Sequence, residues 1–171
     1  MNNKSLFTGE TMYEELKEIK NARDEKKAKA KEDCLHVLTD AHSHLDAMLG
    51  TDNNCSLELG NASGFPATDD GVMAISMREK LLPYDSDICI EAEATMLLTF
   101  GDECYKAEIV ASRRIYGDER VSLKVPTELN EDGRMAVPVE IKYSPEADTT
   151  GTLQQISEAL LREFRNQIKL K

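Results

Sequence analysis

The sequence predicts an α+β protein: an antiparallel β-sheet or small barrel of five to six strands, with helices at both ends of the chain. Three observations predict this class. Apolar residues recur at helical spacing before residue 50, alternate with polar residues between 72 and 143, and return to helical spacing after residue 150. We therefore divide the chain into an N-terminal helical arm (1–50), an antiparallel β domain (51–148) and a C-terminal helix packed on it (149–171).

The helical arm begins near Thr8 or Thr11, either of which suits an N-cap, and Gly50 suits its end. Its middle, residues 20–33, is almost wholly charged or alanine and contains no glycine or proline. Such a stretch consists of strong helix formers but has no apolar face of its own. The pattern therefore leaves open one long helix or a helical hairpin.

The second half of the arm has the clearest packing face. Its spacing of three and four residues is typical of coiled coils, although two heptads do not identify one. The same face would also suit packing on the chain's own β domain, so both interpretations remain open. We predict it as a protein interface, formed by Leu35, Leu38, His42, Leu45 and Leu49.

The β domain is predicted from alternation. Strands are expected at 56–59, 72–77, 88–100, 105–111, 121–125 and 135–143. Short Gly- and Asp-containing connections predict that the last four strands form an antiparallel meander, and Pro138 places the final strand at the border of the sheet. The last helix is expected to begin at Thr150 or Thr152. Its apolar stripe contains Leu153, Ile156, Leu160, Leu161, Phe164 and Ile168.

Composition excludes several classes of function. The formal net charge is −11, so phosphate backbones would be repelled and general nucleic-acid binding is not expected. The sequence shows no export signal and no long apolar run, which predicts a cytoplasmic protein that does not insert into membranes. Its four cysteines form no CxxC pair, and we expect reduced thiols.

Residues 40–46, Asp-Ala-His-Ser-His-Leu-Asp, resemble the Asp-x-His-x-His-Leu-Asp motif of TatD-type metal-dependent hydrolases. The resemblance implies that His42 and His44 share a metal ion at the end of a strand. The surrounding spacing is helical, however, and on a helix these two side chains point about 200° apart. We therefore predict no metal and no cofactor.

Arg113, Arg114 and Arg120 form the one basic concentration of the β domain and are a candidate anion site. Salt bridges within the chain, for instance to Asp118 and Glu119, are the alternative. Glu91 and Glu93 share one face of a predicted strand, as paired catalytic carboxylates do, but an exposed sheet face is the simpler account of them.

A small antiparallel barrel followed by a helix resembles the PilZ domains, which bind cyclic di-GMP. Asn61-Ala62-Ser63 matches half of their second signature, Asp/Asn-x-Ser-x-x-Gly, and no Arg-x-x-x-Arg precedes it. The resemblance is architectural and implies a relative that has lost the nucleotide.

These observations predict a non-enzymatic adaptor or regulatory protein that binds another protein or a second copy of itself through the N-terminal helix. No complete set of reactive residues is recognisable, which favours a non-enzymatic function without deciding it. Two alternatives stay open: a PilZ-like or other small-anion sensor at the arginines, and an enzyme with an unfamiliar carboxylate site at Glu91 and Glu93.

Overall fold

The N-terminal segment forms a single helix. The computed structural model describes residues 9–50, 54–63, 75–126, 139–144 and 150–170, and within it α1 runs from Gly9 to Leu49. The charged middle does not interrupt the helix, so the alternative of a helical hairpin is wrong. Lys20 and Asp24 pair at 2.8 Å across one turn of this stretch, as i,i+4 partners do. Gly50 ends the helix with a φ of 58°, and its N–H donates to the carbonyl of Asp46.

The β domain is a six-stranded, wholly antiparallel sheet that stays open, so the barrel alternative is wrong. β3, β4, β5 and β6 follow one another in space as they do in sequence, which confirms the predicted meander. The strands are β1 (Cys55–Asn61), β2 (Ser76–Leu82), β3 (Asp87–Phe100), β4 (Glu103–Arg114), β5 (Val121–Val125) and β6 (Val139–Tyr143).

One edge of the long strand β3 is shared by two shorter strands. β1 pairs with its second half, from Asn61 opposite Ala94 to Cys55 opposite Phe100. β2 pairs with its first half, from Leu82 opposite Asp87 to Ser76 opposite Glu93. The other edge of β3 is taken by β4. The hairpin between β2 and β3 therefore forms one corner of the sheet.

The second strand is displaced from its predicted position. A strand was expected at 72–77, but residues 72–74 lie outside the described part of the chain and β2 extends to Leu82. Most of its side chains are exposed, and the charged run Arg78-Glu79-Lys80 removes the period-two signal. Among the described residues β6 pairs with β5 alone, so the last strand has the predicted border position there. Pro138 lies outside the described residues.

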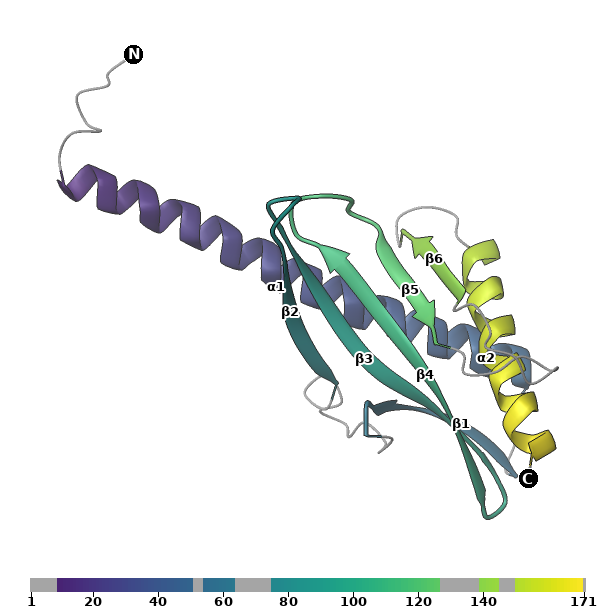
Figure 1. Cartoon of the computed structure of the whole chain (residues 1–171). Coiled ribbons are helices and arrows are strands. Elements are labelled where there is room, and N and C mark those ends of the chain that lie inside the picture. The colour runs from purple at the N-terminus through teal and green to yellow at the C-terminus, as the bar shows by residue number, and fades with distance from the viewer. Residues whose placement is uncertain (1–8, 51–53, 64–74, 127–138, 145–149, 171) are drawn as a thin grey trace.

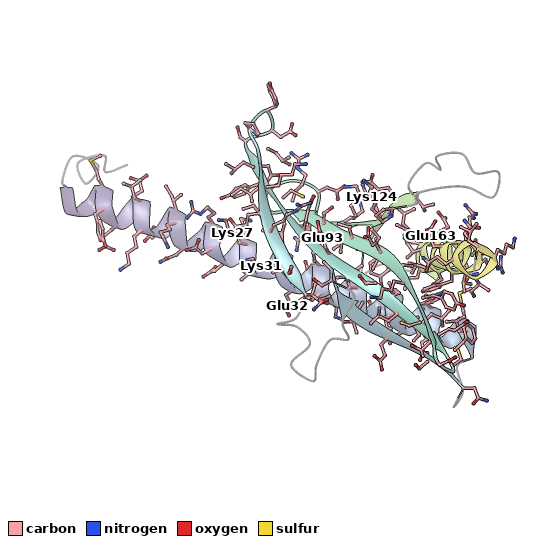
Figure 2. All side chains as sticks on the ribbon, turned by 60° about the horizontal axis from the view of Figure 1, so that its bottom comes forward. Lys27, Lys31, Glu32, Glu93, Lys124 and Glu163 are labelled. Atoms are coloured by element: carbon pink, nitrogen blue, oxygen red, sulfur yellow. The ribbon has the colours of Figure 1, made fainter. Side chains whose placement is uncertain are left out.

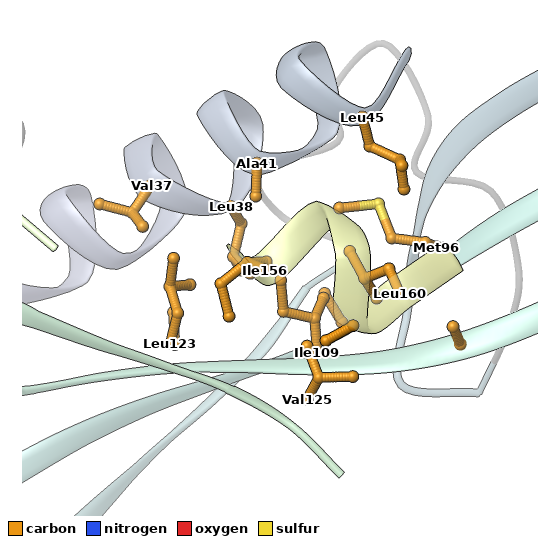
Figure 3. Packing of buried hydrophobic residues seen from close by; sticks show 14 of the residues in the cluster. Val37, Leu38, Ala41, Leu45, Met96, Ile109, Leu123, Val125, Ile156 and Leu160 are labelled. Carbon is orange, nitrogen blue, oxygen red and sulfur yellow. The ribbon is translucent and has the colours of Figure 1, made fainter. Parts of the chain in front are cut away.

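Both helices cover the same face of the sheet, which gives two layers with one main core between them (Figure 1). Alternate residues of the central strands, among them Met96, Ile109 and Leu123, point into this core. Figure 3 shows them facing Val37, Leu38, Ala41 and Leu45 of α1 and Ile156 and Leu160 of α2. The second half of α1 is thus part of the core of the β domain.

The C-terminal helix α2 (Thr150–Leu170) begins at the first of its two predicted starting points. Its stripe is buried at Ile156, Leu160 and Phe164, whereas Ile168 is half-exposed. Hydrogen bonds at two places, Ser157 and Gln167, join α2 to other elements. His44 of α1 and Ser157 are 2.9 Å apart, and the Gln167 side-chain amide bonds the backbone of Lys106 in β4.

The first half of α1 projects beyond the sheet (Figures 1 and 2). Its contact with the sheet begins where Lys27 and Lys31 meet Glu79 of β2, with N–O distances of 2.9 and 3.8 Å. Within the described residues, neither α1 nor α2 has an apolar segment long enough to cross a membrane.

Candidate functional site

The predicted interface stripe lies against the chain's own sheet. Leu38 and Leu45 are fully buried, and Leu35 and Leu49 pack at the margin of the same core. His42 Nε2 lies 2.8 Å from the carbonyl oxygen of Leu57 in β1. This face therefore packs within the chain, which was one of the two interpretations left open. Leu38 and Leu45 are buried in the core and are not exposed to another molecule.

The three histidines serve different contacts. His42 reaches β1, His44 reaches Ser157 of α2, and His36 lies 3.5 Å from Asp40 one turn further along α1. The stretch that resembles the TatD motif is helical, as its spacing predicts. Across the described ranges, no three His, Cys, Asp or Glu side chains gather in a way that could hold a metal ion.

The three candidate arginines each meet a different carboxylate. Arg113 points to α1 and pairs with Asp33, while Arg120 forms a two-pronged pair with Asp118 in its own loop. Arg114 reaches Asp85 at 3.2 Å and Asp87 at 3.0 Å. Their guanidinium groups are therefore already engaged, and the structure does not bring the three together on one anion.

Asp87 is the most enclosed of these carboxylates, with a side chain only 2% exposed. Burial alone would raise its pKa, but the backbone N–H groups of Ile88 and Tyr116 and the Arg114 guanidinium all donate to it. These donors outweigh the burial, so the pKa lies below its ordinary value. Asp87 fixes the corner at which the β2–β3 hairpin and the β4–β5 connection meet.

A polar cavity of about 250 Å³ adjoins Arg113, between α1 and the β4–β5 connection. Lys29, His36 and Arg113 contribute nitrogen atoms to its lining, but Glu32, Asp33 and Glu119 contribute carboxylates. An anion entering it would meet three acidic side chains, so the charge of the lining does not favour anion binding.

The paired carboxylates Glu91 and Glu93 are bridged by a single guanidinium. Arg78 Nη2 of β2 lies 3.0 Å from Glu91 and 2.9 Å from Glu93, on the face of the sheet opposite the helices. Two carboxylates that share one arginine form a cross-strand ion-pair network. Nothing in this arrangement leaves one of them placed as an acid and the other as a base.

The feature of the structure best suited to binding is the projecting half of α1. Met12, Leu16 and Ile19 are 51, 64 and 59% exposed, and Tyr13 beside them is 63% exposed. These four residues, which we call the arm stripe, are apolar side chains that the described part of the chain leaves exposed. The sequence shows their spacing of four and three residues, but only the fold reveals that the sheet ends before it reaches them.

The arm stripe continues the face that is buried further along the same helix. Met12, Leu16 and Ile19 precede three fully buried residues by 18 positions each, which is about five helical turns. Those residues are Ala30, Cys34 and Val37. One apolar face therefore runs along α1, covered by the sheet over its second half and open to water over its first.

An apolar groove of about 280 Å³ lies next to the point where α1 leaves the sheet, at the corner formed by the β2–β3 hairpin. Leu81 is 73% exposed, and Tyr116 closes the groove from the β4–β5 connection. Lys26 of α1 lies over the Tyr116 ring, 5.8 Å from its centre. Tyr116 therefore brings the groove next to α1 at Lys26, about two helical turns after the arm stripe ends at Ile19. The groove is lined by Leu81, Leu82, Pro83, Ser86, Asp87, Ile88 and Tyr116.

Comparison of the chain with protein-family models, with curated proteins and with solved structures finds no match.

Proposed function

We propose that this chain is a non-enzymatic adaptor or regulatory protein that binds protein through the projecting half of α1. The observation that carries the proposal is the arm stripe of Met12, Tyr13, Leu16 and Ile19, each more than half exposed. Apolar side chains repeated on one side of a helix are the usual anchors by which helices bind a groove or another helix.

The cost of exposing this stripe supports a binding role. The helix extends for several turns past the sheet, where it gains nothing from the core. Isolated helical segments of this length are only marginally stable in water, and most helical stability in proteins comes from packing of an apolar face. Burial of the stripe by another protein would provide the packing that the sheet provides for the second half.

Charge placement supports protein rather than nucleic acid as the partner. The chain carries a net charge of −11, and the start of α1 is acidic, since residues 9–19 hold four acidic side chains and one basic one. Lys27 and Lys31 are engaged with Glu79, and Lys20 with Asp24. No continuous basic surface is left along the described part of α1 for a phosphate backbone.

Site-specific photocrosslinking tests the proposal. A photoreactive amino acid replaces Leu16, and a matched variant carries it at Glu158, an exposed position of α2. In the cells that make the protein, we expect covalent protein adducts at position 16, either with another protein or with a second copy, and none at position 158. The adduct yield should fall when Ile19→Ser is added.

Absence of protein adducts at position 16, and likewise when the probe replaces Met12 or Ile19, would overturn the proposal. Adducts of equal yield at positions 16 and 158 would also contradict it, because they would show that collisions, and not the arm stripe, produce them.

A further inference from the structure

We propose that the occupant of the arm stripe is a second copy of this chain, with the two α1 helices paired antiparallel. The inference rests on the proposed function and names its partner. Four properties of the described residues carry it: the phase of the stripe, the space taken by the sheet, the distribution of charge along α1, and the apolar groove at the corner of the sheet.

The position of the sheet excludes a parallel pair. The arm stripe and the sheet-covered residues lie on one face of α1, since Met12, Leu16 and Ile19 are in line with Ala30, Cys34 and Val37. In a parallel pair the two stripes would face each other and both sheets would have to occupy the same space beyond them. In an antiparallel pair the sheets lie at opposite ends, and only the projecting halves overlap (Figure 1).

Charge along the arm selects the same orientation. Residues 9–19 hold four acidic side chains and one basic one, whereas residues 20–31 hold six basic and two acidic ones. An antiparallel pair sets the acidic turns of each copy beside the basic turns of the other. A parallel pair would instead place Arg23 and Lys26 against their own copies, and like charges side by side destabilise a helix pair.

The layers of an antiparallel pair follow from the spacing. With Leu16 of one copy opposite Ile19 of the other, Met12 comes to lie opposite Arg23, whose stem can pack along an apolar side chain. Tyr13 then lies close to Lys20 of the second copy, an arrangement suited to a cation–π contact. Leu16 and Ile19 of the two copies, four apolar side chains in all, meet at the centre of the overlap.

In the antiparallel pair, the start of α1 from the other copy would lie beside the apolar groove. In this arrangement the first turn of each α1 reaches the part of the other helix around residues 23–26. Lys26 there lies over Tyr116, which lines the groove together with Leu81 and Ile88. The exposed Leu81 and the groove are thus covered by the same partner that covers the arm stripe, and one interface accounts for both apolar features of this end of the molecule.

Sedimentation equilibrium of the full chain over a wide concentration range tests whether the partner is a second copy. We expect a concentration-dependent rise from the 19.1 kDa monomer to twice that mass. The double variant Leu16→Ser/Ile19→Ser should weaken dimerisation at least tenfold. Leu170→Ser, which changes a still more exposed leucine at the end of α2, should not alter it. Circular dichroism of each variant establishes that it remains folded.

Zero-length crosslinking of a mixture of ¹⁴N and ¹⁵N protein tests the orientation. Glu10 and Lys26 of one helix are about 24 Å apart, beyond the reach of a direct amide bond. In the antiparallel pair these two residues of different copies approach each other, so we expect links between them that contain one light and one heavy peptide. The variant Lys26→Arg, which keeps the charge but cannot form the amide, is the matched control.

Three results would overturn the inference. A mass that stays at the monomer value shows that no second copy binds, and adducts of the Leu16 probe with a different protein would then leave the proposed function standing. A dimer that Leu16→Ser/Ile19→Ser does not weaken forms through another surface. A dimer without mixed-isotope links between Glu10 and Lys26 has a different orientation.

Discussion

Tyr143 Oη donates a hydrogen bond of 3.0 Å to Asp40 Oδ2, joining the last strand of the sheet to the second half of the first helix. Tyr143 is buried, while Asp40 stays partly in contact with water. Because β6 pairs with β5 alone among the strands that the structure describes, this bond is one of the contacts that hold the edge strand under α1.

Replacing Tyr143 by phenylalanine tests that contact. The Tyr143→Phe variant removes the hydroxyl but keeps the ring, so the free energy of unfolding should fall by about 1 kcal/mol. Tyr84→Phe changes a fully exposed tyrosine in the β2–β3 hairpin and should have no measurable effect. Urea denaturation of both variants gives the comparison, and equal stabilities would show that the bond to Asp40 contributes nothing.

The two halves of α1 should respond differently to the same substitution. Leu38→Ala leaves a cavity between the helix and the sheet and should cost about 2–5 kcal/mol of stability. Leu16→Ala, on the projecting half, should change stability by less than about 0.5 kcal/mol when measured at low protein concentration. Thermal unfolding checks both. Similar losses would contradict the placement of the sheet beneath only the second half.

The ion pair between Arg113 and Asp33 should matter more than those on the surface of the same helix. Arg113 is 9% exposed, so Asp33→Ala leaves an almost buried guanidinium without its partner and should cost about 3 kcal/mol. Asp24→Ala breaks the exposed pair with Lys20 and should cost about 0.5 kcal/mol or less. Adding Arg113→Met to Asp33→Ala should restore part of the stability, because it removes the stranded charge.

The stability that Asp87 provides should depend on pH. Its pKa in the folded protein lies below the ordinary value of 3.8. The ionised carboxylate therefore stabilises the fold fully above that value, and the contribution is lost as the pH falls through the lower, folded pKa. The difference in unfolding free energy between the wild type and Asp87→Asn should be constant above about pH 5 and shrink below it. Urea titrations at several pH values measure it, and a difference that widens on acidification would contradict the assignment.

The cysteines should differ in reactivity. Burial raises the pKa of the Cys34 thiol to about 12, so at pH 8 almost none of it is thiolate, whereas Cys104 is exposed. In the folded protein, iodoacetamide should modify Cys104 within minutes and Cys34 only after denaturant is added. Mass spectrometry of the alkylated peptides reads both sites in one sample. Early labelling of Cys34 would show that the second half of α1 separates readily from the sheet.

Local patterns in the sequence were sufficient to predict most of the helices and strands. Helical spacing and the absence of glycine and proline predict a helical arm up to Gly50, and period-two alternation predicts β3, β4 and β5 close to their observed bounds. These signals are local because hydrogen bonds and side-chain directions repeat along one segment. Where most side chains of a strand are exposed, as in β2, the alternation disappears and the prediction was displaced.

Tertiary structure decided which side chains are available to a partner. Leu16 and Leu38 stand in equally helical surroundings, and their sequence neighbourhoods do not say which one a sheet covers. In the same way, Arg113, Arg114 and Arg120 are close in sequence, but the pleat and the loop direct them to three separate carboxylates. Sequence alone thus determined the helices, the strands and the acidic charge, because each depends on neighbours along the chain. The place where the sheet ends under α1 depends on pairing between distant strands, and that pairing leaves the arm stripe exposed.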